Sequence, residues 1–312
     1  MIGNENERTK KFKIFDLRSD QLESILDFCG KDKNGRPPYY QRSLIKRLMT
    51  QLASSMENTL DVIFENQRVA VVTIVDKIEN PTHSANIEVI GLDTSFLSVE
   101  LFESIFCHIE KMQSRFEALE VGLDPSLALI EPVVVSRGFK LHYLTYTMKL
   151  ENIVPRENDL QTNTIFQPLN LDIFDQYYSV LYSSFSKNLE TSIPPLDEMK
   201  KNFDVQKAND TLLLKFNSIA VGFFSVAVDE DDSSSGEVRM IGVLPEKRSQ
   251  GIGRILLSKA LCVLSERGCK SAHLTVAVTN ESALKLYEEL GFIVSEKFSS
   301  YQMFPKILLG EY

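Results

Sequence analysis

The sequence predicts an α/β protein of two domains, each a mixed, mostly antiparallel twisted sheet with helices on both faces. The chain has 312 residues, which is longer than one typical domain. A polar stretch with a proline and several charges, residues 151–159, divides it near the middle. Each half shows antiparallel-type strands first and a helix-linked pair of strands later. We therefore expect domains over 1–150 and 164–312, joined by a linker over 151–163.

In the first half, alternating apolar residues predict strands, and apolar residues at three- and four-residue spacing predict helices. Two of the strands are expected to form a hairpin around 65–68. The strands of this half are expected over 11–17, 59–64, 69–76, 85–90, 118–121 and 139–150. The helices are expected over 21–28, 43–53, 99–116 and 127–136.

The second half repeats this order of elements with little residue identity. Gly138-Phe139 and Gly291-Phe292 occupy matching points, each after a helix and before a long strand. The strands of this half are expected over 165–169, 211–216, 220–229, 237–244, 272–278 and 292–304. The helices are expected over 173–185, 196–203, 251–267 and 282–290.

Composition argues against several classes of function. No apolar run approaches the roughly 18 residues that span a bilayer, and residues 1–11 lack the apolar core of a signal peptide. The net charge of −9 argues against nucleic acid as a partner, because phosphate backbones require a basic face. The four cysteines form no CxxC pair and no cluster with histidine, which predicts reduced thiols, no metal site and a cytoplasmic protein.

The most informative segment, residues 237–257, is typical of a strand, a short basic turn with two glycines and a helix. The first N–H groups of a helix lack internal partners, and the helix dipole favours negative charge there. Gly251 and Gly253 allow a phosphate to approach the backbone, while Lys247 and Arg248 add positive charge. A diphosphate is therefore the expected ligand.

Other phosphate motifs fit this turn less well. The Gly-Lys-Ser/Thr end of a P-loop is missing, and no third glycine follows Gly251 and Gly253 at the dinucleotide spacing. A glycine-rich turn that binds no ligand is the structural alternative. A nucleotide-binding protein that uses the turn for a simple phosphate is a functional one.

The run from Val243 to Gly253 resembles the acyl-CoA-binding motif of the GNAT superfamily of N-acetyltransferases, Q/R-x-x-G-x-G/A. A second segment of that family follows at the expected distance, from Asn280 to Phe292. The resemblance is tight over 237–292 and looser over 164–304. It implies two GNAT-like domains and an acetyl-CoA-dependent transfer to a primary amine of a small molecule or peptide. The arrangement resembles tandem acetyltransferases such as mycothiol synthase.

Carried over by position, the resemblance implies a cofactor site. Backbone groups of Ile241 and Val243 would pair with the pantetheine arm like an added strand, and Asn280 would contact the arm beyond the next strand. The backbone amides expected to hold the pyrophosphate belong to Arg248, Ser249, Gln250, Gly251, Ile252 and Gly253.

Glu237 and Tyr287 are the expected catalytic residues. Glu237 lies six residues before Val243, where many relatives carry a general base; a solvent-facing carboxylate at a strand end is the alternative. Tyr287 occupies the family's usual general-acid position and also completes an apolar helical stripe. These readings are compatible, because a packed phenol can still present its hydroxyl. The N–H of Val243 is the expected oxyanion donor by analogy.

The first half departs from the motif. Its matching region, residues 88–96, has no arginine and no double glycine, and Asp93 supplies the wrong charge for a diphosphate. The helix before Gly138 contains Pro132 and no tyrosine equivalent to Tyr287. We expect a degenerate copy that does not bind CoA productively.

Two further features are expected to be structural. His273 is expected to be an ordinary strand residue, and the acidic run 229–232 a solvated hairpin turn. The alternative to an enzyme is a non-catalytic acyl-CoA-binding regulatory protein. Retention of both Glu237 and Tyr287 favours the enzyme.

Overall fold

The computed structural model describes residues 12–17, 24–25, 28–29, 58–76, 84–155, 164–186, 193–204, 209–229 and 232–305. The chain forms two compact units. Unit 1 combines Met1–Tyr143 with Phe298–Tyr312, and unit 2 is Leu144–Lys297. Hydrophobic side chains form a separate main core in each unit.

Unit 1 is a mixed sheet with one parallel strand pair. Its strands are β1 (Lys13–Asp16), β2 (Thr59–Phe64), β3 (Gln67–Asp76), β4 (Ser84–Leu92) and β5 (Ala118–Leu123), with parts of β6 (Lys140–Leu150) and β12 (Ile293–Met303). Its helices are α3 (Val99–Ile109) and α4 (Glu131–Ser136), with 3-10 turns η3 (Thr94–Phe96), η4 (Gln113–Arg115) and η5 (Pro125–Ile130). β1 to β4 pair antiparallel in chain order, β4 pairs parallel with β5, and β5 pairs antiparallel with β12.

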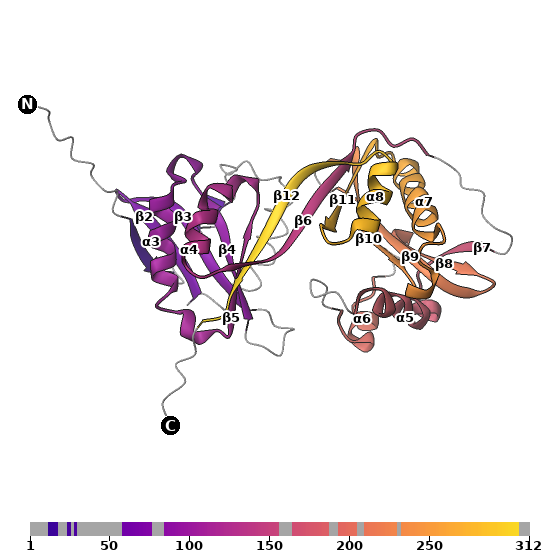
Figure 1. Cartoon of the computed structure of the whole chain (residues 1–312), viewed down its shortest axis with the longest axis horizontal. Coiled ribbons are helices and arrows are strands. Elements are labelled where there is room, and N and C mark those ends of the chain that lie inside the picture. Colours follow the sequence, from indigo (N-terminus) through magenta and orange to yellow (C-terminus); the bar gives the residue numbers. More distant parts are fainter. Residues whose placement is uncertain are drawn as a thin grey trace, which may run out of the picture. The chain divides into compact units, whose positions relative to one another are not determined.

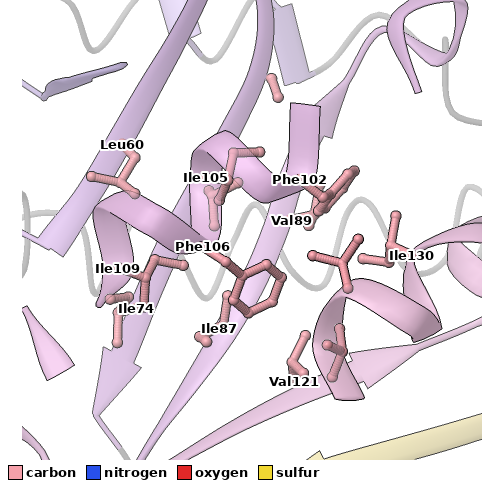
Figure 2. Close-up of a cluster of buried hydrophobic side chains, with 14 of the residues drawn as sticks. Leu60, Ile74, Ile87, Val89, Phe102, Ile105, Phe106, Ile109, Val121 and Ile130 are labelled. Carbon is pink, nitrogen blue, oxygen red and sulfur yellow. The ribbon is translucent and has the colours of Figure 1, made fainter. Parts of the chain in front are cut away.

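One face of this sheet is covered by α3, which Figure 2 shows above the strands. The apolar residues of α3 recur every three or four positions, so they form one stripe that packs on the inward-facing strand residues. The stripe is Leu101, Phe102, Ile105, Phe106 and Ile109, and it meets Leu60, Ile74, Ile87, Val89 and Val121 in the same core.

Unit 2 repeats the plan. Its strands are β7 (Thr164–Pro168), β8 (Thr211–Phe216), β9 (Ile219–Val228), β10 (Ser235–Val243) and β11 (Ser271–Ala277). Its helices are α5 (Phe174–Phe185), α6 (Leu196–Lys201), α7 (Ile252–Glu266) and α8 (Glu281–Glu289), with 3-10 turns η6 (Leu171–Ile173) and η8 (Pro245–Lys247). β7 to β10 pair antiparallel in chain order, and β10 pairs parallel with β11.

Helices lie on both faces of the sheet in unit 2 (Figure 1). Successive residues of a strand face opposite sides, and Phe223 accordingly packs in a core with α5 while Phe224 packs in a core with α7. The predicted mixed sheet between two layers of helices is therefore confirmed.

Matching turns in the two units extend the repeat. Gly138 and Gly291 both have positive φ, 87° and 94°, in the left-handed position that follows a helix. The β2–β3 and β8–β9 hairpins both close through two residues of positive φ, the pattern of a type I′ turn. These residues are Glu65 (φ 48°), Asn66 (φ 67°), Asn217 (φ 50°) and Ser218 (φ 66°).

Strands β6 and β12 each begin in one unit and end in the other (Figure 1). Residues 145–150 of β6 pair antiparallel with β11 in unit 2, and residues 299–303 of β12 pair antiparallel with β5 in unit 1. The compact units therefore differ from the contiguous halves 1–150 and 164–312. The start of the expected linker also belongs to unit 2, because the amide of Ile153 donates to the carbonyl of Lys270 at 2.8 Å.

Several helices differ from their expected extents. The helix expected over 99–116 ends at Ile109, and the one expected over 127–136 is a 3-10 turn followed by α4. The helix expected over 43–53 and most of that over 21–28 lie outside the described residues. Within the described ranges, no helix is long and apolar enough to cross a membrane.

Candidate active site

The turn between β10 and α7 contains two left-handed residues. Ser249 has φ 60°, and Gly251, the residue that precedes α7, has φ 80°. A serine rarely adopts positive φ, whereas glycine does so without steric cost. Left-handed residues beside ordinary ones turn successive N–H groups toward one side, as in the backbone concavities that bind anions.

Five successive amides of this turn, from Ser249 to Gly253, donate to no protein acceptor in the part of the chain that the structure describes. The amide of Arg248 is already used, because it donates to the carbonyl of Pro245 at 3.3 Å. The available run is therefore one residue shorter than the predicted one. No side chain caps the start of α7 either. Unsatisfied donors at the positive end of a helix dipole make this an anion site.

The two glycines of the motif have different surroundings. A Cβ built on Gly251 would meet nothing within 4 Å, so the space above the turn is open to a ligand. A Cβ on Gly253 would lie 3.2 Å from Cδ2 of Leu286, so this glycine lets α8 approach the first turn of α7. An ion pair between Arg254 and Glu289 joins the same two helices.

Polar side chains hold the turn in place. The guanidinium of Arg248 donates from Nη2 to the carbonyl of Ser184 on α5 at 3.0 Å, and from Nε to the carbonyl of Val243 at 3.3 Å. The side-chain amide of Gln250 donates to the carbonyl of Glu246 at 3.1 Å. Arg248 therefore anchors the turn to α5 while its positive charge stays beside the amides.

β10 and β11 pair over only three positions, the last of which joins Glu237 and His273. Beyond them this edge of β10 has no strand partner among the described residues. The amide of Leu244 donates to Val221 on β9 at 3.0 Å. Because hydrogen-bonded positions alternate in an antiparallel pair, Ile241 and Val243 point their backbone groups away from β9. An extended ligand could pair there with Ile241 and with the amide of Val243, whose carbonyl already accepts from Nε of Arg248.

Glu237 lies at the point where β10 and β11 separate. The preceding residue, Gly236, faces Leu264 of α7, so Glu237 faces the opposite side of the sheet. Its side chain is 22% exposed, and its Oε2 lies 3.2 Å from Nε of Arg239. A β-bulge between Val238 and Met240 follows immediately. The carboxylate is thus partly shielded from water yet accessible at the opening.

Tyr287 packs on α8 with its ring 6.0 Å from that of Phe292, centroid to centroid. Burial raises the pKa of Tyr287 to about 12. Its hydroxyl makes no hydrogen bond to another described residue. Both readings of this tyrosine therefore stay compatible with the structure: the ring belongs to the core, and the phenol keeps a proton that it can donate.

Asn280 has a structural role in addition to its predicted cofactor contact. It precedes α8, and its Oδ1 accepts hydrogen bonds from the amide of Ala283 at 3.3 Å and from the hydroxyl of Ser282 at 3.2 Å. This is an N-cap, which stabilises the helix that carries Tyr287.

Two residues beside Glu237, His273 and Asp229, were expected from the sequence to have structural roles only. His273 is the partner of Glu237 on β11, and Nδ1 of His273 lies 3.7 Å from Oδ2 of Asp229. The signal for this cluster is the pairing register of β9, β10 and β11, which separates these residues by tens of positions in the chain and joins them in the sheet.

Comparison with known proteins agrees with this geometry. Residues 174–292 match the Acetyltransferase (GNAT) family. The chain is 38% identical to N-alpha-acetyltransferase 30 of Xenopus laevis over 68 residues, 22% of this chain and 25% of the relative. It is 29% identical to mycothiol acetyltransferase of Propionibacterium freudenreichii over 127 residues, 39% of this chain and 41% of the relative. The chain thus spans less than half the length of these relatives.

Two solved structures share the fold over nearly the whole chain. A GCN5-related N-acetyltransferase from Sphaerobacter thermophilus has a TM-score of 0.70 at 14% identity, with 94% of this chain and 95% of that chain covered. A tandem GNAT protein from the clavulanic acid biosynthesis pathway has a TM-score of 0.66 at 11% identity, with 94% and 98% covered.

The sheet that opens beside Glu237 and the uncapped helix start both lie in the part of unit 2 that matches the acetyltransferase (GNAT) family, residues 174–292. Over nearly its whole length the chain shares the fold of a tandem GNAT protein.

Proposed function

We propose that unit 2 transfers the acetyl group of acetyl-CoA to a primary amine of a small molecule or peptide by direct attack. The observation that carries this proposal is the run of five amides, Ser249 to Gly253, at the start of α7. Among the described residues these amides have no acceptor, and the adjacent edge of β10 beyond Glu237 has no partner strand. The matched relatives include acetyltransferases named for mycothiol and for protein N-termini, which supports an acceptor of either size.

Binding of acetyl-CoA would use backbone groups almost entirely. The amides of the turn would hold the pyrophosphate. The pantetheine arm would extend along β10 and pair with Ile241 and Val243, whose backbone groups face the opening. The thioester would then lie near the point where β10 and β11 separate, beside Glu237.

The chemistry needs three proton or charge events, and the residues present can supply each. Glu237 takes a proton from the acceptor ammonium, and the free amine attacks the thioester carbonyl. A backbone N–H on the open edge of β10 stabilises the oxyanion of the tetrahedral intermediate; that of Ile241 lies nearer to Glu237 than the expected donor, Val243, which is six residues or roughly 20 Å along the strand. The carbon–sulfur bond then breaks, and the phenol of Tyr287 donates a proton to the leaving sulfur. As the intermediate collapses, the nitrogen loses its second proton to solvent and Tyr287 regains a proton from solvent. The products are the acetylated amine, CoA and one proton.

A reducing compartment such as the cytoplasm fits the four cysteines. None forms a disulfide, and Cys29, Cys262 and Cys269 are buried as small apolar side chains.

The test is thiol release from acetyl-CoA in the presence of an amine panel that includes aminothiol sugars, polyamines and peptides with free N-termini. We expect turnover with at least one amine, and a loss of about 100-fold or more in Glu237→Gln. Glu266→Gln is the matched control, because Glu266 is an exposed residue at the far end of α7 that pairs only loosely with Lys259, at 3.8 Å.

Two other outcomes would replace the proposal. Binding of CoA without turnover on any amine would indicate the regulatory alternative. Thermal stabilisation by ATP that exceeds stabilisation by CoA would indicate a nucleotide-binding protein.

A further inference from the structure

His273 and Glu237 share one face of the sheet in unit 2. They are partners in the last paired position of β10 and β11. The residues just before them, Gly236 and Ala272, face the core that contains α7. Because side chains alternate, Glu237 and His273 both face the other side. Neighbouring strands lie about 4.8 Å apart, so one water could bridge the two side chains, which make no direct ion pair with each other.

Asp229 approaches His273 from the opposite side of β10. It follows β9, and its amide donates to the carbonyl of Ser235 at 3.0 Å, which fixes its backbone against the start of β10. By continuation of the register, Asp229 lies on the same face as Ala227, the partner of Glu237. Its Oδ2 is 3.7 Å from Nδ1 of His273, with side chains 20% and 26% exposed.

Among the described residues, the other charged groups near this trio are Lys149, Arg239 and Asp232, and Arg239 pairs with Glu237 itself. Lys149 on β6 is the register partner of His273, and its Nζ lies 3.1 Å from Oε1 of Glu151. Asp232, further along the hairpin, accepts hydrogen bonds from the amide and the hydroxyl of Ser234. Two carboxylates thus flank the imidazole, one of them at the opening.

We propose that Asp229, His273 and Glu237 form a proton-release path for the acetyl transfer proposed above, on which this inference rests. Glu237 takes a proton from the acceptor ammonium. It then passes that proton through one water to Nε2 of His273 and returns to the carboxylate form. Asp229 holds Nδ1 and stabilises the imidazolium, which releases the proton to water at the exposed side. Over one turnover the acceptor ammonium loses two protons, one to the sulfur through Tyr287 and solvent and one to solvent through His273.

The geometry gives each residue a distinct task. A base must be returned to its unprotonated form before the next cycle, and Glu237 is only partly exposed. Histidine is the side chain that best exchanges a proton near neutral pH, and a carboxylate on its other nitrogen fixes the ring and favours the charged form. His273 and Asp229 act through Glu237, so they are positioning residues and proton carriers.

The experiment measures kcat/KM against pH with whichever panel amine is acetylated, in the full chain and in His273→Gln and Asp229→Asn. We expect losses of about 10-fold or more near pH 7 that shrink to less than about 3-fold near pH 9, where solvent removes the proton unaided. The matched control is His108→Gln in unit 1, because His108 forms a similar pair with Asp16 at 3.6 Å and lies in the unit without the site.

A second measurement uses NMR of the His273 ring with no substrate. Glu237→Gln and Asp229→Asn should each change the chemical shifts of its ring nitrogens, and His108→Gln should not. The path is overturned if these chemical shifts do not change, or if the loss in His273→Gln is the same at every pH. A wild-type chain that acetylates no amine defeats the proposed function itself, which is a different result from an active enzyme with no pH-dependent loss.

Discussion

Helices α3 of unit 1 and α7 of unit 2 begin at equivalent points in the order of elements, but the amides at their N-termini are satisfied differently. Each helix follows a strand of a parallel pair, β4 with β5 and β10 with β11. Before α3, Asp93 accepts hydrogen bonds from the amide and hydroxyl of Ser95, and Ser98 accepts from the amide of Leu101. Before α7, no side chain caps the helix. One helix start is satisfied by its own residues, and the other is left for a ligand.

In both units the two strands of the parallel pair separate after a few paired positions. β4 and β5 pair only over Ser84–Ile87, so they separate much as β10 and β11 do. The difference lies before the helix. In unit 1 the carboxylate of Asp93 caps the 3-10 turn η3 and the hydroxyl of Ser98 caps α3. In unit 2 this place has Arg248 and amides that donate to no acceptor among the described residues. A phosphate would meet repulsion in one and donors in the other. We infer that CoA occupies unit 2 alone.

Gly251→Asp should have the largest effect, because it brings the arrangement of unit 1 into unit 2. A carboxylate beside the amides would occupy the donors and repel the pyrophosphate, so we expect a loss of CoA affinity of about 100-fold or more, measured by calorimetry. Gly268→Asp is the matched control. Gly268 has φ 92° and nothing within 4 Å of its Cβ position, as Gly251 has, but it lies at the other end of α7. Equal losses in both variants would show that backbone strain, not the anion site, is responsible.

Tyr287→Phe should lower kcat by about 10- to 100-fold and leave the affinity for CoA within about twofold, because the ring packing is kept and only the proton donor is lost. The sign of the pH effect follows from the raised pKa of about 12. The phenol stays protonated below that value, so Tyr287 should cause no loss of wild-type kcat up to about pH 10. Stopped-flow thiol release across pH checks both points. A fall in kcat centred well below that pH in the wild type, absent from Tyr287→Phe, would contradict them.

Saturating CoA should protect the two helix starts unequally. We expect amide hydrogen exchange over 249–253 to slow by about 10-fold, because these donors gain acceptors, with no change over 94–101. Mass spectrometry of peptides from the two segments makes the comparison within one sample. Protection of 94–101 would mean that unit 1 also binds CoA and would overturn the inference drawn from Asp93 and Ser98.

The sequence could predict most elements because their signals are local. Alternation and helical spacing located β2, β8 and α7 to within a residue or two, and the spacing of Gly251 and Gly253 located the turn. The pairing of β6 with β11 in unit 2, and of β12 with β5 in unit 1, could not be predicted in this way. Residue patterns of a strand predict that it is a strand, whereas the strand it pairs with depends on the completed sheets.

The same limit applied to the site. Glu237 and Tyr287 are named by their distance from a motif, but the proximity of Asp229 and His273 depends on the registers of β9, β10 and β11. The different surroundings of Gly251 and Gly253 depend on where α8 packs. The neighbours of Glu237 and the surroundings of the two glycines therefore depend on contacts between elements, which spacing along the chain does not predict.

Ser98→Ala should have the smallest effect and should fall on stability alone. The amide of Leu101 would lose its acceptor, so we expect unit 1 to lose about 1 kcal/mol of unfolding free energy, measured by urea denaturation. Ser104→Ala is the control on the same helix, because its hydroxyl only donates to the Glu100 carbonyl within the helix and its removal should be neutral or slightly stabilising. CoA affinity should be the same in both variants. The start of α7 in unit 2 offers no equivalent substitution, since no side chain of the described residues caps it.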